Sequence, residues 1–378
     1  MFHYLDNAAT TQTRPEAAQA AVTAMTEEWG NPSSRYAFGQ EASGRLKEHR
    51  AQVAAGLGCR PEEVYFLSCG TEGDNWAIAA AVEKNRRKGK HIITTAIEHA
   101  AVLEPIRELE RQGYEVTWLQ PDQQGIITAE QVEAALRPDT ILVAMMLVNN
   151  ELGTVLPVAE TARAIRAARC PALLHCDAVQ GFLKVPFTAR SLGADYITIS
   201  AHKLGGPKGV GALYIGGKAK NAQPLLYGGG QESGLRPGTE ATAQIAGFAK
   251  AVELRTRRLE EILGHTARCK ACATERLGAI PGVQFVGAAD APHILSLSLP
   301  GYPSGNIVSD LDSKGICVSA GSACHRGKSS HVLVAMGLPK KVAAGTIRIS
   351  FGPETTLEDI DALYDALLEH KNTRFPML

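Results

Sequence analysis

Lys203 stands between an apolar run and a glycine-rich loop, in the stretch Ile197–Ile215. Surroundings of low dielectric constant disfavour the charged ammonium, so we expect the pKa of this amine to lie below that of a free lysine. An amine that is neutral near physiological pH can attack a carbonyl carbon and form a Schiff base. The sequence therefore predicts a nucleophilic lysine at position 203.

A candidate anion site lies at Gly70 and Thr71, between a strand end at Leu67 and a helical stretch. Backbone N–H groups at a helix start, together with the Thr71 hydroxyl, suit a phosphate group. A Gly-Thr pair is also an ordinary helix cap, and the segment matches neither the Walker pattern nor the dinucleotide-binding glycine pattern.

Further polar residues follow other apolar runs. Asp177 comes directly after one such run, and Gln180 lies one helical turn later on the same side. A carboxylate at this point can pair with a protonated ring nitrogen and an amide can bind a phenolic oxygen, although Asp177 could equally be a plain helix cap. Asn150, in Asn149–Gly153, could simply belong to a turn, and His99 could be an ordinary surface or core histidine.

Taken together, these residue types match what pyridoxal phosphate requires. That cofactor acts as an electron sink and needs a Schiff-base lysine, a carboxylate beside its ring nitrogen and an anchored phosphate. A nicotinamide cofactor would need no such lysine, and no Gly-x-Gly-x-x-Gly follows an early strand.

The elements that must position these residues alternate along the chain. The sequence predicts strands at 91–95, 115–119, 140–148, 172–176, 196–200 and 211–215, with helices at 100–112, 128–136 and 158–168. Such alternation predicts an α/β fold with a mainly parallel sheet, in which ligands gather at the carboxyl ends of the strands. The candidate residues stand largely at such ends.

The pattern changes after Gly230. A long helix is predicted at 241–277, followed by strands at 294–299, 316–319 and 346–350 and a terminal helix at 357–370. We therefore predict a large domain at 13–252 and a smaller α+β domain made of 253–378 together with 1–12.

Composition narrows the functional classes. The chain has 378 residues, 45% of them hydrophobic, and its 39 basic and 39 acidic residues create no overall field that would attract nucleic acid or a membrane. The chain opens without a basic stretch followed by an apolar run, and it contains no apolar run long enough to span a bilayer, so we expect a cytoplasmic protein. The eight cysteines are expected to be reduced, with Cys269 and Cys272 as two thiols on a helix rather than a metal site.

Ten motifs in order along the chain resemble those of cysteine desulfurases, and they cover nearly the whole sequence. They are Tyr4–Thr11, Gly30–Ser34, Ser68–Glu72, Glu98–His99, Asn149–Glu151, Asp177–Gln180, Ser200–Lys203, Gly228–Glu232, Gly238–Thr239 and Ser319–Cys324. The resemblance implies a pyridoxal-phosphate enzyme of fold type I with the class V aminotransferase fold. Its large domain would carry a mainly parallel seven-stranded sheet.

The resemblance also implies a role for each matching residue. Lys203 would hold the cofactor as the internal aldimine and move protons, and His99 would stack on the ring and assist proton transfer. Asp177 would pair with the pyridine nitrogen, with Gln180 and Asn150 near the phenolic oxygen. The phosphate would be held by Gly70, Thr71, Ser200 and His202, together with Thr239 from the other subunit of a homodimer. Arg348 would grip the substrate carboxylate as a two-pronged fork, and Asn150 would also contact the substrate.

Cys324 stands in a small, polar, glycine-rich loop and is followed by His325 and Arg326. Basic neighbours favour the thiolate, which is the reactive form of cysteine. The resemblance implies that the Cys324 thiolate takes the sulfur of L-cysteine as a persulfide, leaves L-alanine and passes the sulfur to an acceptor protein. Acceptors in iron–sulfur cluster assembly, tRNA modification or cofactor maturation would all fit.

The segment His325–Ser330 departs from the family, because many members have a Thr-Ser pair after the cysteine and a Leu-Glu-Pro run before the next helix, and the loop is about two residues shorter here. Two other functions therefore stay open. One is a selenocysteine lyase or a related lyase of the same fold, and the other is a scaffold that mainly binds partners. Lys203, His99 and Arg348 argue against the scaffold, which would need none of them.

Overall fold

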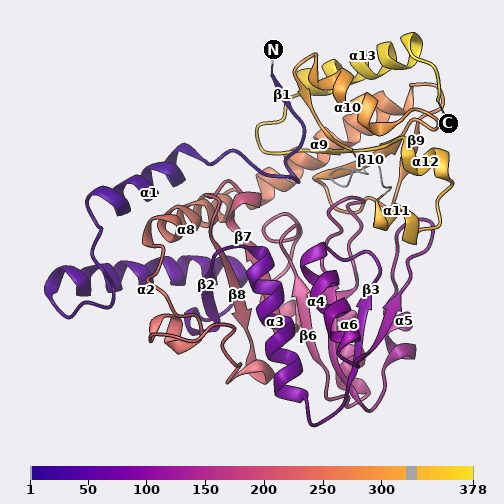
Figure 1. Ribbon diagram of the computed structural model, residues 1–378. Helices are drawn as coiled ribbons and strands as arrows, with labels where there is room; N and C mark the ends of the chain where they lie inside the picture. The colour runs from indigo at the N-terminus through magenta and orange to yellow at the C-terminus, as the bar shows by residue number, and fades with distance from the viewer. Residues whose placement is uncertain (1, 321–329, 378) are drawn as a thin grey trace.

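A seven-stranded sheet forms the centre of the larger part of the molecule (Figure 1). The computed structural model describes residues 2–320 and 330–377. Along the sheet the strand order is β2-β8-β7-β6-β5-β3-β4, and within it β8 runs antiparallel to both of its neighbours. The strands are β2 (Val64–Leu67), β3 (His91–Thr95), β4 (Glu115–Leu119), β5 (Thr140–Met146), β6 (Leu173–Asp177), β7 (Tyr196–Ser200) and β8 (Gly211–Ile215). The predicted α/β fold with a mainly parallel sheet is confirmed.

Helices cover both faces of this sheet because alternate side chains of each buried strand point to opposite faces. On β5, Leu142 shares a hydrophobic core with Trp76 of α3, whereas Val143 shares the opposite core with Ile165 of α6. The helices of this part are α1 (Pro15–Thr26), α2 (Ala37–Leu57), α3 (Gly70–Asn85), α4 (Ala100–Arg111), α5 (Ala129–Ala135), α6 (Val158–Ala167), α7 (Ala189–Leu192) and α8 (Thr242–Arg257), with short 3₁₀ turns η1 (Pro61–Glu63), η2 (Ala201–Lys203), η3 (Gly217–Ala219) and η4 (Gln231–Gly234).

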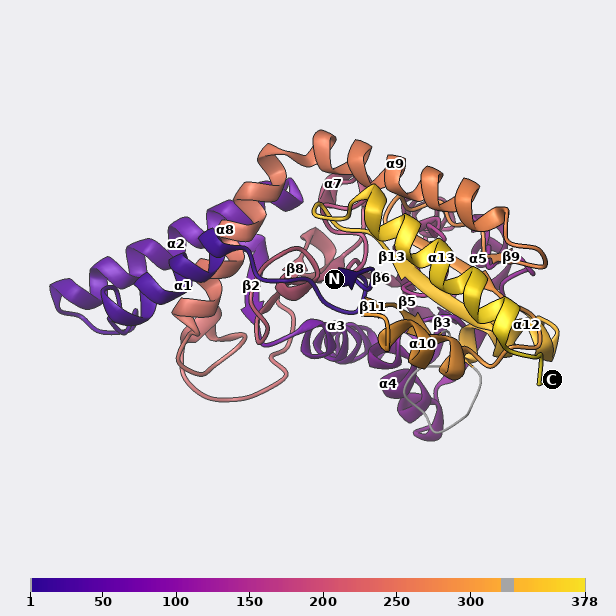
Figure 2. The ribbon, with the colours of Figure 1, turned by 90° about the horizontal axis from the view of Figure 1, so that it is seen from above.

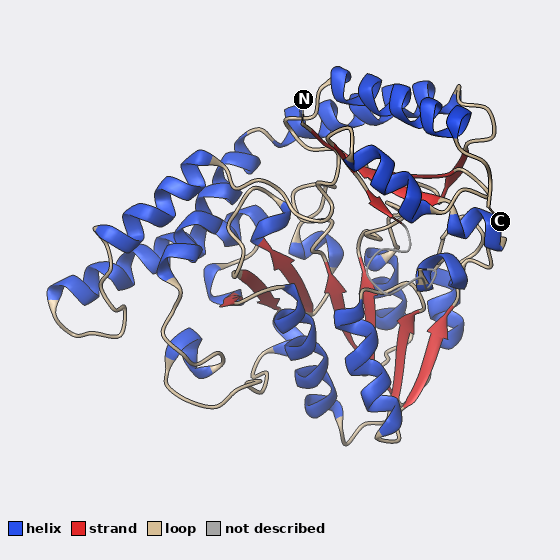
Figure 3. Cartoon of the chain, turned by 45° about the horizontal axis from the view of Figure 1, so that its top comes forward, coloured by secondary structure: helices blue, strands red, loops and turns tan. Residues whose placement is uncertain are grey.

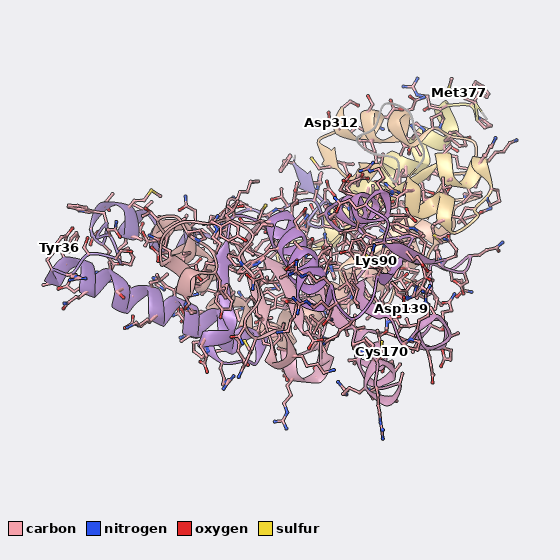
Figure 4. The ribbon with its side chains drawn as sticks, turned by 60° about the horizontal axis from the view of Figure 1, so that its bottom comes forward. Tyr36, Lys90, Asp139, Cys170, Asp312 and Met377 are labelled. Carbon is pink, nitrogen blue, oxygen red and sulfur yellow. The ribbon has the colours of Figure 1, made fainter. Side chains whose placement is uncertain are left out.

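Helices α1 and α2 pack on α8 and form an arm that projects from the sheet. Tyr36, which precedes α2, lies at the far end of this arm and is 63% exposed (Figure 4). The sequence analysis did not predict these two helices.

A second, smaller sheet is antiparallel, with the strand order β12-β13-β10-β9. Helices α9 and α13 lie side by side over it (Figure 2), and Leu277, Leu297, Ile347 and Leu363 belong to a core separate from those of the large sheet. The elements are β9 (Gln284–Val286), β10 (Ile294–Ser298), β12 (Ser319–Ala320), β13 (Thr346–Ser350), α9 (Leu259–Gly278), α10 (Ser304–Asp312), α11 (His331–Ala335), α12 (Lys340–Ala344) and α13 (Leu357–Thr373).

The N-terminal residues lie against this smaller part. Strand β1 (His3–Tyr4) pairs in parallel with β11 (Ile316–Cys317), and Leu5 lies in the same core. Two predicted elements prove to be divided. The expected strand at 316–319 is split between β11 and β12, which belong to different sheets. The expected helix at 241–277 breaks at Arg258, whose φ of −117° and ψ of 19° leave the helical region.

The carboxyl ends of the parallel strands face the smaller sheet. Lys90, Asp139 and Cys170 shortly precede β3, β5 and β6, and Figure 4 places them at the end of the molecule away from Asp312 and Met377. Most arrowheads of the large sheet accordingly point toward the smaller sheet in Figure 3. In the described residues, no helix is long and apolar enough to cross a membrane. The seven cysteines in these residues are all free.

Candidate active site

A cavity of about 280 Å³ opens at the carboxyl edge of the large sheet. Its walls come from β6, β7, the starts of α3 and α4, the N-terminal segment and β13 of the smaller sheet. Ten residues selected from the sequence line it: Gly70, Thr71, His99, Asn150, Asp177, Gln180, Ser200, His202, Lys203 and Arg348. Residues up to 278 positions apart in the chain therefore converge on one space, from Gly70 to Arg348.

Lys203 ends the 3₁₀ turn that follows β7. Its Nζ donates hydrogen bonds to the carbonyl oxygens of Ala8 at 2.7 Å and Ala9 at 2.8 Å. Burial, and after it the guanidinium of Arg348, lowers the pKa of Lys203 to about 8. The amine is thus held by neutral carbonyls in a place that disfavours its charge, which is the condition for a nucleophilic lysine.

Asp177 ends β6 with its carboxyl group buried. Burial, and after it the nearby Asp74, raises the pKa of Asp177 to about 7, although the N–H of Val179 donates to Oδ1 at 2.9 Å and acts in the opposite direction. This N–H contact is the cap-like bond that the sequence left open as an alternative. Among the described residues Asp177 has no salt bridge, so a cation or proton donor in the cavity would relieve the cost of its burial.

A buried polar pair that the sequence analysis missed lies behind Asp177. His175 Nε2 is 3.2 Å from Asp74 Oδ1 and 3.1 Å from Thr198 Oγ1. Burial raises the pKa of Asp74 to about 8 and lowers the pKa of His175 to about 4. Both groups are therefore neutral at pH 7, and their contact is not an ion pair. The sequence did hold one sign of this buried pair: Asp74 is a carboxylate on a helix face that otherwise carries small and apolar residues.

The candidate phosphate site combines a helix start with an unused hydroxyl. Gly70 begins α3, and a Cβ atom at this position would lie 2.9 Å from Val179 Cγ2. Ser200 Oγ is buried and has no hydrogen-bond partner among the described residues. Burial, and after it Lys203, lowers the pKa of His202 to about 4, so its imidazole is neutral and its Nδ1 lies 3.2 Å from Thr10 Oγ1. The orphan hydroxyl and the open helix start suit an oxyanion.

Two further side chains on the wall are already hydrogen-bonded. His99 is the N-cap of α4, where its Nδ1 accepts the N–H of Ala101 at 3.2 Å. Gln180 Nε2 donates to the carbonyl of Ala8 at 2.7 Å, and Lys184 Nζ donates to Gln180 Oε1 at 3.1 Å. The buried Lys184 was not selected from the sequence, where it stands as one charged residue in an apolar run.

Arg348 lies on β13 with its guanidinium at the cavity. Nη1 donates to the carbonyl of Asn150 at 2.8 Å, and Nη2 donates to Asp6 Oδ1 at 2.8 Å and to Ser319 Oγ at 3.0 Å. Nε is buried and has no partner among the described residues. The side chain is therefore oriented by three segments and keeps donors that could bind a carboxylate.

Two selected residues are not placed in the cavity. Thr239 is exposed and does not line it. Cys324 falls in 321–329, outside the described residues. Within the described ranges, no group of three or more histidine, cysteine or acidic side chains could hold a metal ion.

The residues present fit pyridoxal phosphate. Lys203 offers an amine of lowered pKa. Within residues 2–320 and 330–377, the buried Asp177 lacks a salt-bridge partner and the Ser200 hydroxyl beside the start of α3 lacks a hydrogen-bond partner. These are the three contacts that an aldehyde, a pyridine nitrogen and a phosphate require.

Comparisons with known proteins identify the family to which this chain belongs. The family model for aminotransferase class-V matches residues 3–363. The chain is 39% identical over 371 residues to cysteine desulfurase IscS of Clostridium botulinum, covering 96% of this chain and 93% of that protein. The chain belongs to the cysteine desulfurases of the class-V aminotransferase family. Its cofactor is pyridoxal 5'-phosphate, which this family uses.

Solved structures of family members have the same fold. A NifS-like protein superimposes with a TM-score of 0.93 at 35% identity, covering 99% of this chain and 100% of that chain. A structure of SspA in complex with cysteine gives a TM-score of 0.80 at 32% identity, covering 94% of this chain and 100% of that chain. The resemblance of the ten motifs is thereby confirmed at the level of the family and its fold.

Proposed function

We propose that this enzyme converts L-cysteine to L-alanine and carries the released sulfur as a persulfide on Cys324. The observation that carries the proposal is Lys203, an amine whose pKa is lowered to about 8 in a cavity shared with Asp177 and Arg348. The relative SspA binds cysteine, and the curated relatives are named cysteine desulfurases.

In this proposal the cavity residues divide the contacts to cofactor and substrate. Gly70, Thr71, Ser200 and His202 would hold the phosphate, and Asp177 would pair with the ring nitrogen. His99 would contact the ring, and Gln180 and Asn150 would contact its phenolic oxygen. The bound cofactor supplies an electron sink, which allows the Cβ–S bond of the substrate to break.

The protein's own groups then bind the substrate and move its protons. Arg348 holds the substrate carboxylate, and the neutral amine of Lys203 takes a proton from the substrate and later returns one. The Cys324 thiolate attacks the substrate sulfur, so a new S–S bond forms as the Cβ–S bond breaks. The electron pair of the broken bond stays with the carbon fragment, which gains a proton and leaves as alanine.

We further propose a homodimer, to which the partner subunit contributes its Thr239. Several large apolar side chains on the α1–α2 arm and the loop before η4 are exposed, as expected of a surface that another subunit covers: Met25 at 56%, Trp29 at 67%, Tyr36 at 63%, Leu226 at 54% and Tyr227 at 86%. The proposed setting is the cytoplasm, and the proposed acceptor is a protein such as an iron–sulfur scaffold.

The experiment is an alanine assay with L-cysteine on the wild type, Lys203→Ala and Cys324→Ala. We expect the wild type to form alanine and sulfide, Lys203→Ala to form neither, and Cys324→Ala to lose sulfide release. Full sulfide release by Cys324→Ala would contradict the persulfide route. Turnover of selenocysteine without turnover of cysteine would replace the proposal with a selenocysteine lyase.

A further inference from the structure

Lys184 is a lysine buried at the back of the active site, with only 4% of its surface exposed. Its Nζ donates a hydrogen bond to Oε1 of Gln180 at 3.1 Å, and among the described residues no carboxylate forms a salt bridge with it. Burial, followed by the charges of Arg255 and Lys203, lowers its pKa well below the usual value. Burying an amine without a counter-ion is costly, so its presence calls for a reason.

Gln180 connects this lysine to Lys203. Gln180 Nε2 donates to the carbonyl of Ala8 at 2.7 Å, and that same carbonyl accepts Lys203 Nζ at 2.7 Å. A backbone carbonyl can only accept, so the end of the amide that faces Ala8 is the nitrogen, and the oxygen faces Lys184, whose Nζ donates to it. The chain of contacts runs from Lys184 through Gln180 and Ala8 to Lys203.

We propose that Lys184 is a positioning residue that holds the Gln180 amide with its nitrogen toward Ala8 and the cavity, and thereby keeps the Lys203 amine reactive. The inference rests on the proposed role of Lys203. Without Lys184, the Gln180 oxygen would be buried without a donor, a state that costs more than a lost hydrogen bond. To reach another donor the amide would turn away from Ala8, and the Ala8 carbonyl would then accept a hydrogen bond from Lys203 alone.

Such a turn would stabilise the charged form of Lys203 and raise its pKa. Arg348, Asp177, Asp6 and the adjacent His202 also surround this amine, and a change at Lys184 leaves them in place. Lys184 and Lys203 also repel each other when both are charged, and Lys184→Gln, which removes the charge but keeps an N–H donor, separates that repulsion from the hydrogen bond. Arg255 and His293 also lie near Lys184, and neither forms part of the hydrogen-bonded chain.

The test measures the pKa of Lys203 in protein freed of cofactor. A trace of an amine-selective acetylating reagent is applied across a range of pH, and acetylation at Lys203 is quantified by peptide mass spectrometry. For Lys184→Met, which keeps the length but removes the donor, we expect the pKa of Lys203 to rise by about half a unit to one unit. Lys184→Gln, which keeps an N–H donor, is expected to retain the wild-type pKa.

Lys270→Met is the matched control. Lys270 is also partly buried and has a lowered pKa, but it donates to the carbonyls of Ala289 and Ala291, away from the cavity. This change should leave the pKa of Lys203 unaltered. Should Lys184→Met fail to fold, the smaller Lys184→Leu also removes the donor and takes its place.

A double-mutant cycle with Gln180→Leu tests whether the effect passes through the amide. In the Gln180→Leu background, Lys184→Met is expected to cause no further rise. An unchanged pKa in Lys184→Met, or the same rise with and without Gln180, would overturn the proposal. Because acetylation needs no substrate turnover, this outcome is separate from a failure of the alanine assay, which would overturn the proposed function instead.

Discussion

The rate at which cofactor-free protein captures pyridoxal phosphate should follow the ionisation of Lys203. With a pKa of about 8, the amine is neutral in about one molecule in ten at pH 7, whereas at the ordinary lysine value of 10.5 it would be neutral in about one in three thousand. Capture should therefore rise with pH to a midpoint near 8. Burial provides most of this shift, and the Arg348 guanidinium provides the next largest part.

Arg348→Gln should move this midpoint upward for two reasons. It removes a positive charge that disfavours the ammonium, and it frees the Asp6 carboxylate, which favours the ammonium. A rise of about one unit would slow capture at pH 7 roughly tenfold. The assay follows the absorbance of the bound cofactor after mixing, from pH 6 to 10.

The control for this prediction is Arg163→Gln. Arg163 lies exposed on α6 and pairs there with Glu160. Its replacement should leave both the midpoint and the rate unchanged. A wild-type midpoint near 10, or an identical midpoint in Arg348→Gln, would refute the reasoning.

Three other predictions concern packing, a buried ion pair and pH. Gly70→Ala should weaken pyridoxal phosphate binding in an equilibrium titration, because its Cβ would meet a side chain at 2.9 Å; Gly44→Ala, with nothing within 4 Å, should bind normally and gain about 1 kcal/mol of stability. Arg50→Met should lower the urea-measured free energy of unfolding by about 3–5 kcal/mol, because it leaves the buried Glu232 carboxylate without its two 2.6 Å bonds; a loss below about 1 kcal/mol would contradict this. The pKa of Asp74 is raised from 3.8 to about 8, so the folded state binds this proton more tightly than the unfolded state. The free energy of unfolding should therefore fall as pH rises between these two values, and Asp74→Asn should reduce that fall. An equal fall with pH in the wild type and in Asp74→Asn would contradict the raised pKa of Asp74.

The large sheet was readable from the sequence because its strands are short apolar runs bounded by polar turns. The predicted ranges 91–95, 115–119, 196–200 and 211–215 agree with β3, β4, β7 and β8 to the residue, and 346–350 likewise agrees with β13 of the smaller sheet. The expected strand at 140–148 ends earlier, at Met146. Leu147 N–H still bonds the carbonyl of Asp177, the last residue of β6, whereas Val148 pairs with Val155 in a separate antiparallel bridge. Strand existence follows from local pattern, whereas strand ends depend on tertiary hydrogen bonds.

The arm could not be read in the same way. Helix α2 contains many alanine, glycine and charged residues and few large apolar ones, so it has little periodic signal. Its position depends on packing against α8, far along the chain. The break at Arg258 was also missed, since the residues on both sides of it favour helix.

The candidate site was predictable where a side chain follows a strand. Asp177 and Lys203 carry such a signal, and the structure brings them to one cavity. The carbonyls of Ala8 and Ala9, which hold the Lys203 amine, carry none, because every residue has a carbonyl. Lys184 acts through contacts that no spacing rule reveals.

The central claim is that sulfur is carried on Cys324, and the most direct test is the intact mass of the protein. The enzyme and Cys324→Ala are incubated with pyridoxal phosphate and L-cysteine without reductant, weighed by mass spectrometry and assayed for alanine. The account predicts a gain of about 32 Da, one sulfur atom, on the wild type alone, together with alanine. The same gain on Cys324→Ala, with alanine formed at the wild-type rate, would contradict it.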